Sequence, residues 1–144
     1  MASIYTLDAS VFLNAFNPYE PGHEESHRLL ARLQEQAMPI VVPTLLLPEV
    51  AAAISQGRKD EGLARKFAAA LSRLPHLTMI PLDETLAHQA ADVAAQHRLR
   101  GSDAVYVAVA LRFGSTLITL DREQRERVVG ALPAHYPAEV LAAE

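Results

Sequence analysis

Short apolar segments that alternate with helix-like stretches constrain the fold of this chain more than any other feature. Four such segments occur, at residues 3–7, 40–42, 77–81 and 116–120. Short buried strands alternating with helices are typical of βα units, in which the strands run parallel and helices cover both faces of the sheet. The sequence therefore predicts an α/β fold of three layers, with a central parallel sheet between two layers of helices.

Apolar spacing and recognisable ends define the helices between these strands. We expect helices at residues 10–16, 23–36, 61–74, 83–97, 102–114 and 122–129, and one that runs through Glu49 to about residue 56. Asp83 and Ser102 are expected to cap their helices at the N-terminus, while Gly57 and Gly114 are expected to end theirs. A short edge strand near residues 135–136 completes the prediction.

Composition bounds the possible classes of protein. The chain has 144 residues, of which 50% are hydrophobic and 21% are charged, so we expect residues 1–144 to form a single globular domain. It has no cysteine, which excludes disulfides, thiolate metal sites and cysteine nucleophiles. No signal peptide and no apolar run of membrane-spanning length is evident, so we expect a cytoplasmic protein with no membrane contact.

The acidic balance of the chain limits how it can meet nucleic acid. A formal net charge of -4 argues against a non-specific binder held by a broad positive field. It does not exclude a metal-dependent nuclease, because cations bound in a carboxylate pocket reverse the local field where a phosphate must approach.

Four acidic residues stand among apolar neighbours, which is unusual for carboxylates that solvent covers. Asp8 and Asp121 each follow a predicted strand, and Glu49 and Asp103 lie on predicted helices. Ligands of parallel α/β sheets bind at the carboxyl ends of the strands, a rule that selects Asp8 and Asp121. A buried unpaired carboxylate costs several kcal/mol, and carboxylates that meet raise one another's pKa. A divalent cation is the usual way to keep such a group ionised.

The donor set indicates the metal and the reaction. Carboxylate oxygens without thiolates suit Mg²⁺ or Mn²⁺. Such an ion activates a water as a hydroxide nucleophile and orients a phosphodiester for in-line attack. We therefore predict Asp8, Glu49, Asp103 and Asp121 as catalytic acids, with Asp8, Asp103 and Asp121 as the metal ligands.

The same residues carry a resemblance to a known family. The segment 7–10 (Leu-Asp-Ala-Ser), a helical Glu49, the segment 101–110 and the segment 117–121 (Leu-Ile-Thr-Leu-Asp) occur in an order that resembles the PIN domain. The resemblance covers nearly the whole chain and is strongest to the VapC-type toxins of bacterial toxin-antitoxin pairs.

The resemblance implies more than the residues show by themselves. It implies the strand order 3-2-1-4-5 and an endoribonuclease activity that depends on Mg²⁺ or Mn²⁺. It further implies that Ser10 and Thr119 support the acids or a bound water. Toxins of this type form homodimers and are silenced by a cognate VapB-type antitoxin whose tail enters the acidic groove.

Two positions depart from the simplest pattern. Pro48 precedes Glu49, and it either lies in the first turn of that helix, where its missing N–H costs little, or kinks the helix. Glu123 follows Asp121 by two residues and is available as the fourth acid in its place. Arg100 and Arg122 lie beside the acidic motifs, and we predict them as RNA contacts, although arginines on a solvated face are as common.

Alternative functions remain open at this stage. Residues 23–27 (His-Glu-Glu-Ser-His) match the zinc-peptidase pattern H-E-x-x-H, with His23 and His27 as ligands, Glu24 as the base and Glu49 as a conceivable third ligand. The polar flanks of this motif, just after a Pro-Gly turn, favour a chance match. A catalytically weak PIN-like module that binds RNA or protein is a second alternative. A phosphotransfer domain is a third, but its pattern requires an acid where Ser10 stands.

Overall fold

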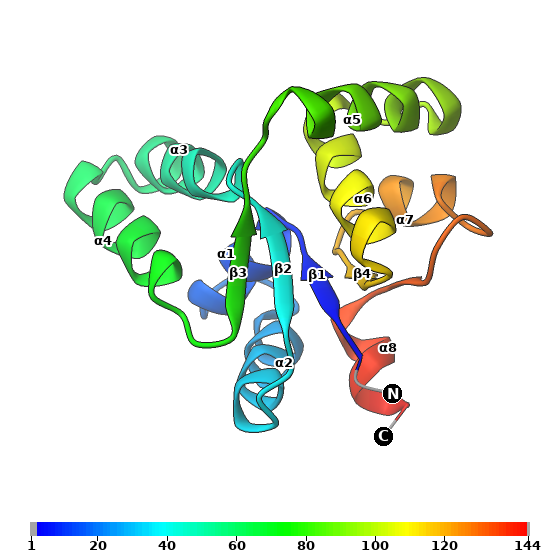
Figure 1. Ribbon diagram of the computed structural model, residues 1–144. Helices are drawn as coiled ribbons and strands as arrows, with labels where there is room; N and C mark the ends of the chain where they lie inside the picture. The colour runs from blue at the N-terminus through cyan, green and yellow to red at the C-terminus, as the bar shows by residue number, and fades with distance from the viewer. Residues whose placement is uncertain (1–2, 144) are drawn as a thin grey trace.

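A five-stranded parallel sheet lies at the centre of the molecule, in the strand order β3-β2-β1-β4-β5 (Figure 1). The structure is a computed structural model that describes residues 3–143. The strands are β1 (Tyr5–Leu7), β2 (Ile40–Pro43), β3 (Leu77–Ile80), β4 (Thr116–Ile118) and β5 (Ala134–His135). Tyr5 in β1 is in register with Ile40 on one side and Thr116 on the other, so the first strand is central.

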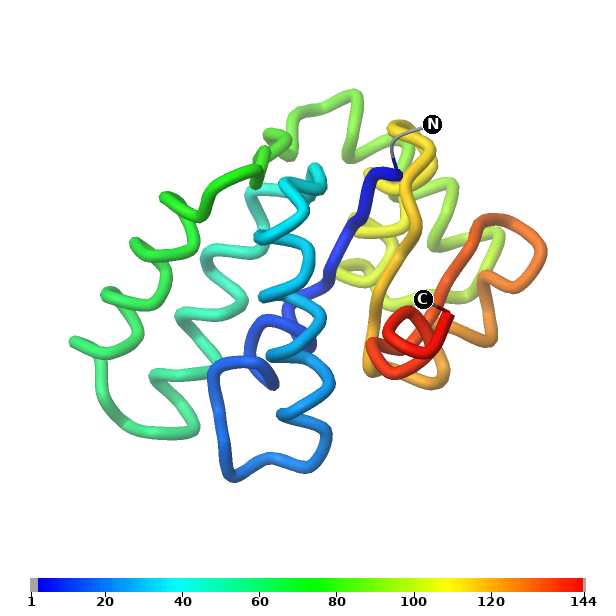
Figure 2. Tube along the Cα trace, turned by 90° about the horizontal axis from the view of Figure 1, so that it is seen from below, coloured from blue at the N-terminus to red at the C-terminus, as the bar shows by residue number. Residues whose placement is uncertain are grey.

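Helices connect the strands and cover both faces of the sheet. They are α1 (Ala9–Phe16), α2 (His23–Glu35), α3 (Leu46–Arg58), α4 (Glu61–Ser72), α5 (Glu84–His97), α6 (Gly101–Phe113), α7 (Arg122–Arg127) and α8 (Pro137–Ala142). Helices α5 and α6 lie on one side of β1, and α1 and α2 lie on the other (Figure 2). The predicted three-layer α/β fold and the strand order 3-2-1-4-5 are confirmed.

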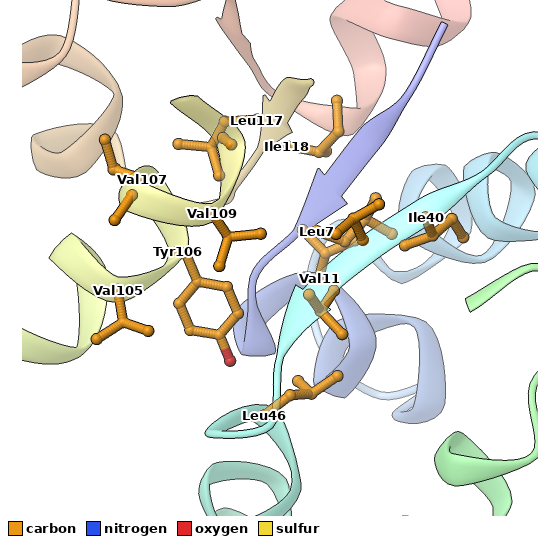
Figure 3. Close-up of a cluster of buried hydrophobic side chains, with 14 of the residues drawn as sticks. Leu7, Val11, Ile40, Leu46, Val105, Tyr106, Val107, Val109, Leu117 and Ile118 are labelled. Carbon is orange, nitrogen blue, oxygen red and sulfur yellow. The ribbon is translucent and has the colours of Figure 1, made fainter. Parts of the chain in front are cut away.

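Helix α6 is the most deeply buried helix on its face of the sheet. Seven consecutive residues, 104–110, are buried, so the helix is covered on all sides rather than along one stripe. Its side chains pack with those of β1, β2 and β4, including Leu7, Ile40 and Ile118 (Figure 3). Because this packing fixes the helix against three strands, it also fixes its first turn, which carries Asp103.

Several predicted boundaries were wrong by a few residues, and each has a local cause. Arg100, with extended backbone, is the N-cap of α6, and Ser102 lies inside the helix. Helix α3 does not end at Gly57 but continues to Arg58, and Lys59 takes the left-handed conformation (φ 54°) that closes it. Pro48 lies in the first turn of α3, the first of the two predicted alternatives.

The C-terminal part contains one helix that the sequence analysis did not predict. Pro137 begins α8, where the missing N–H of proline costs nothing, and the Glu139 carboxylate accepts a hydrogen bond from the Tyr136 N–H (2.8 Å). The edge strand β5 lies one residue earlier than predicted, because Tyr136 caps this helix. Within residues 3–143 no helix has the length and apolar content needed to cross a membrane.

Candidate active site

Asp8 is a buried carboxylate at the carboxyl end of the central strand. It follows β1 directly and caps α1, and the residue is only 5% exposed. One carboxylate oxygen accepts hydrogen bonds from the Ser10 N–H (3.1 Å) and the Ser10 hydroxyl (2.5 Å). The other oxygen accepts one from the Thr119 hydroxyl (2.5 Å). The carboxylate is thus held in place by neutral donors from Ser10 and Thr119.

The loop after β4 is tied to this carboxylate. Strand β4 ends at Ile118, two residues before its predicted end. The Thr119 N–H still donates to the His135 carbonyl oxygen (3.1 Å), but the two N–H groups after it bond to side chains. The Leu120 N–H donates to the Ser10 hydroxyl (3.2 Å), and the Asp121 N–H donates to the Thr119 hydroxyl (3.0 Å). Asp121 was predicted to follow the strand directly, but it caps α7 and is separated from β4 by Thr119 and Leu120.

Arg100 bridges two of the predicted acids. Its Nε donates to the Asp103 carboxylate (2.9 Å) and its Nη2 donates to the Asp121 carboxylate (2.7 Å). Asp103 lies in the first turn of α6 and Asp121 at the start of α7, so one guanidinium joins two helices. Arg100 was predicted as an RNA contact, whereas in this structure its guanidinium faces the protein's own carboxylates.

Glu49 reaches the same end of the sheet from α3. Its carboxylate accepts a hydrogen bond from the Tyr106 hydroxyl (2.6 Å). Tyr106 is almost fully buried on α6, and its hydroxyl points away from the apolar side chains around it, towards the start of α3 where Leu46 lies (Figure 3). The buried tyrosine therefore orients the Glu49 carboxylate through this hydrogen bond. We refer to Asp8, Glu49, Asp103 and Asp121 together as the acid cluster.

The acids of the cluster are close enough that the charge of one raises the pKa of another. Burial raises the pKa of Asp8 to about 6, against the lowering effect of its hydrogen bonds from Ser10, Thr119 and the backbone, and the Asp103 charge raises it further. Burial is also the main cause that raises the pKa of Glu49 and of Asp103. Asp103 is the electrostatic centre, because its charge acts on both Asp8 and Glu49, while Asp121 acts on it.

The chemistry of the acid cluster fits a hard divalent cation. All the donors are carboxylate oxygens, burial is the main cause that raises the pKa of Asp8, Glu49 and Asp103, and a cationic group already lies between Asp103 and Asp121. In the arrangement seen for residues 3–143, no three acidic or histidine side chains are grouped closely enough to hold one ion. Holding a metal would therefore require these side chains to shift from their present positions.

Comparison with known proteins identifies the family. The model of the PIN domain matches residues 5–129, which is most of the chain. The chain belongs to the PIN domain family. No curated protein matches the chain significantly.

Solved structures share this PIN fold at low sequence identity. PAE2754 from Pyrobaculum aerophilum has a TM-score of 0.71 and 21% identity, with 99% of this chain and 90% of that chain covered. VapBC2 from Rickettsia felis, bound to a DNA fragment from its promoter, has a TM-score of 0.70 and 14% identity, with 92% of this chain and 98% of that chain covered. The Mycobacterium tuberculosis toxin VapC20, described as cleaving the sarcin-ricin loop, has a TM-score of 0.67 and 20% identity, with 85% of this chain and 92% of that chain covered.

Other predicted residues of this PIN domain lie outside these contacts. Glu123 pairs with Arg127 one turn along α7, and its side chain is 65% exposed, although its charge still acts on Asp103. Arg122 pairs with Glu126 on the same helix and is 82% exposed. Asp121 rather than Glu123 thus shares a cationic partner with Asp103.

The H-E-x-x-H segment has a structural explanation in this PIN domain. The His23 Nδ1 lies 2.8 Å from the Asn14 carbonyl oxygen, and the Ser26 hydroxyl donates to the Asn14 side chain (2.6 Å). The segment therefore locks the start of α2 to the end of α1. His23 and His27 form no metal-binding group with a third acidic or histidine side chain in the described part of the chain. Glu49, the conceivable third zinc ligand, bonds instead to Tyr106.

Two residues that contact the acids were missed by the sequence analysis. Tyr106 was not among the predicted site residues, although it follows Asp103 by three positions and so shares its helix face. Gln124 is almost fully buried; its N–H donates to the Asp121 carboxylate (3.1 Å) and its side-chain amide to the Asp103 carbonyl oxygen (3.3 Å). The spacing Asp-x-x-Gln at the start of α7 resembles a capping box and was the available signal.

Proposed function

We propose that this PIN domain is a metal-dependent endoribonuclease of VapC type, which cleaves RNA phosphodiester bonds. The observation that carries the proposal is the convergence of four acids from four separate parts of the chain at the carboxyl end of a parallel sheet. Ligands bind there in open α/β folds, and burying carboxylates together is costly unless they have a cationic partner.

In this proposal the side chains have separate tasks. Asp8, Asp103 and Asp121 hold Mg²⁺ or Mn²⁺, and Glu49 is the fourth catalytic acid. When bound, such an ion supplies Lewis-acid activation of a water and neutralises charge on the phosphate. Ser10 and Thr119 keep the Asp8 carboxylate oriented through the hydrogen bonds described above. Tyr106 fixes Glu49 from the buried side of the site.

Arg100 and Arg122 are proposed as contacts to RNA. Both side chains are largely exposed, at 72% and 82%, and both lie at the starts of helices that carry or follow an acid of the cluster. A guanidinium suits a phosphate because it can donate two parallel hydrogen bonds. Single-stranded loops of folded RNA are the favoured substrate class, since their phosphates are accessible.

The partners and the cellular setting belong to the same proposal. We propose a cytoplasmic homodimer that is silenced by a cognate VapB-type antitoxin. Structures of VapBC complexes share this fold, and among them are complexes from Rickettsia felis and Salmonella typhimurium. Co-purification of the protein with the product of the adjacent reading frame, followed by loss of RNA cleavage in the complex, tests the antitoxin.

The activity is tested with a panel of structured RNAs incubated with Mg²⁺ or Mn²⁺. Wild-type protein is expected to cleave at defined positions, and Asp8→Asn and Asp103→Asn are each expected to abolish cleavage while the circular dichroism spectrum stays unchanged. Equal cleavage by wild type and both variants would show that the acids are not the catalytic site. Tight RNA binding without cleavage under any divalent ion would instead support the alternative of a binding module.

A further inference from the structure

The guanidinium of Arg100 lies between two acids of the cluster that are partly exposed to solvent. It donates to Asp103 at 2.9 Å and to Asp121 at 2.7 Å, and these side chains are 17% and 27% exposed. The Arg100 side chain itself is 72% exposed. The same Oδ2 atoms that would serve a metal ion are therefore engaged by a residue that water can reach from outside.

In this position the Arg100 guanidinium and a divalent ion would compete for the same two carboxylates and could not both occupy them. Both need the carboxylate oxygens of Asp103 and Asp121, and two cations at this distance repel each other. The arrangement with Arg100 in place brings no three acids within reach of one ion in residues 3–143. Metal binding at these two acids therefore requires the guanidinium to leave.

The arginine is placed so that it can leave at modest cost. Arg100 is the N-cap of α6, so its side chain starts at the rim of the site and not within the core. Salt bridges of exposed side chains contribute little to stability, because water and salt screen them. By contrast, the hydrogen bonds from Ser10 and Thr119 to Asp8 are shielded from solvent, and nothing requires them to break.

We propose that Arg100 is a resident counter-ion of the metal-free protein, which competes with the divalent ion for Asp103 and Asp121 and is exchanged for it. The proposal rests on the proposed function, since it assumes a metal at these acids. The exchange leaves the metal-free protein with two compensated acids, and it lowers the affinity for metal relative to a protein that lacks the arginine. On exchange the guanidinium is freed at the rim of the site.

Direct measurement of Mn²⁺ binding tests this exchange. Protein stripped with EDTA is titrated with Mn²⁺ at pH 8, and free ion is followed by electron paramagnetic resonance for wild type, Arg100→Ala, Arg100→Gln and Arg100→Lys. Removing two exposed ion pairs should tighten Mn²⁺ binding by about fivefold in the Ala and Gln variants. Lys keeps the charge without the planar fork and should fall between these variants and wild type.

A matched control separates local competition from general electrostatics. Arg122→Ala removes the same charge from the same end of the molecule, but Arg122 pairs with Glu126 and not with the acid cluster. Its Mn²⁺ affinity should stay within about twofold of wild type, because screened charges at a distance act weakly. Equal gains in Arg122→Ala and Arg100→Ala would contradict a specific competition.

The outcomes also distinguish this inference from the proposed function. Wild-type protein that cleaves RNA and binds Mn²⁺, with folded Arg100 variants that bind it equally or more weakly, overturns the counter-ion role alone. Wild-type protein that neither binds Mn²⁺ nor cleaves RNA overturns both proposals. Thermal melting of each metal-free variant checks folding, and the exposed position of Arg100 predicts that all of them fold.

Discussion

The acid cluster consists of two halves that are stabilised in different ways. In the inner half, Asp8 and Glu49 accept hydrogen bonds from neutral hydroxyls, those of Ser10, Thr119 and Tyr106. In the outer half, one exposed guanidinium bridges Asp103 and Asp121. Neutral donors orient a carboxylate without cancelling its charge, whereas the arginine cancels charge but can be removed by solvent or by another cation.

The two halves differ in how far the negative charge of their carboxylates is compensated. Asp8 is buried and has a pKa raised to about 6, so its negative charge at neutral pH is held at a cost to the fold. The outer acids have a cationic partner of their own in Arg100. Experiments that remove one kind of support at a time test this contrast.

The largest effect is expected from Asp8→Asn. An amide keeps the shape of the side chain but lacks the charge that a divalent ion requires, and metal catalysis supplies several kcal/mol of transition-state stabilisation. RNA cleavage should therefore fall by about a thousandfold or more. Single-turnover cleavage at saturating Mn²⁺ measures it, and the variant should melt at or above the wild-type temperature without metal. A loss below tenfold would place the chemistry in the outer half.

The cost of the buried Asp8 charge should appear as a pH dependence of stability. Because the folded pKa of about 6 lies above the ordinary value of 3.8, the folded protein binds the proton more tightly than the unfolded chain does. Stability from this group is therefore greatest below pH 3.8 and is lost as the pH rises through 6, by about 3 kcal/mol. Urea unfolding of metal-free wild type and Asp8→Asn at several pH values measures the contribution of Asp8 to the free energy of unfolding. Parallel curves for the two proteins would contradict it.

Thr119→Val removes a neutral donor while keeping the side-chain shape. Asp8 then loses one hydrogen bond that lowers its pKa, so that pKa should rise above about 6. Loss of a supporting residue of this kind typically costs about tenfold or more in activity or metal affinity. In a plot of cleavage rate against pH, the rise of the rate on the acid side should move to higher pH. A reduced rate with this rise at an unchanged pH would mean that Thr119 acts only through the turn before Asp121.

Tyr106→Phe tests the support of Glu49 from the buried side. The ring stays in the core, so the effect is limited to one hydrogen bond, and we expect unfolding free energy to change by about 1 kcal/mol. Cleavage should fall by only a few-fold, because Glu49 keeps its charge. A collapse of activity as large as that of Asp8→Asn would show that Glu49 is as demanding in position as the metal ligands.

The smallest effect on cleavage is expected at the H-E-x-x-H segment. His27→Ala and His23→Ala should leave RNA cleavage unchanged, because His23 bonds to α1, His27 lies beside the His23 ring, and both lie apart from the acid cluster. His23→Ala should lower the unfolding free energy by about 1 kcal/mol through loss of its contact to the Asn14 carbonyl. Stoichiometric zinc that disappears in His27→Ala would revive the peptidase alternative.

Local pattern was sufficient to predict the layers of the fold. The alternation of apolar segments and amphipathic stretches is a property of neighbouring residues, so it predicted four of the five strands well and the three-layer arrangement. The strand order came from the resemblance and not from the periodicity. Helix α8 was missed because its six residues carry too little periodicity to stand out, and only its Tyr-Pro-x-Glu start marks it.

Four candidate acids could be identified from the sequence alone, because a carboxylate with apolar neighbours stands out in the order of residues along the chain. What the sequence did not determine is which group neutralises or orients each of them. Arg100 is near Asp103 in the chain but 21 positions from Asp121, and Tyr106 is 57 positions from Glu49. These partners are chosen by the packing of α6 against the sheet, which brings distant segments together, and only the tertiary structure contains that information.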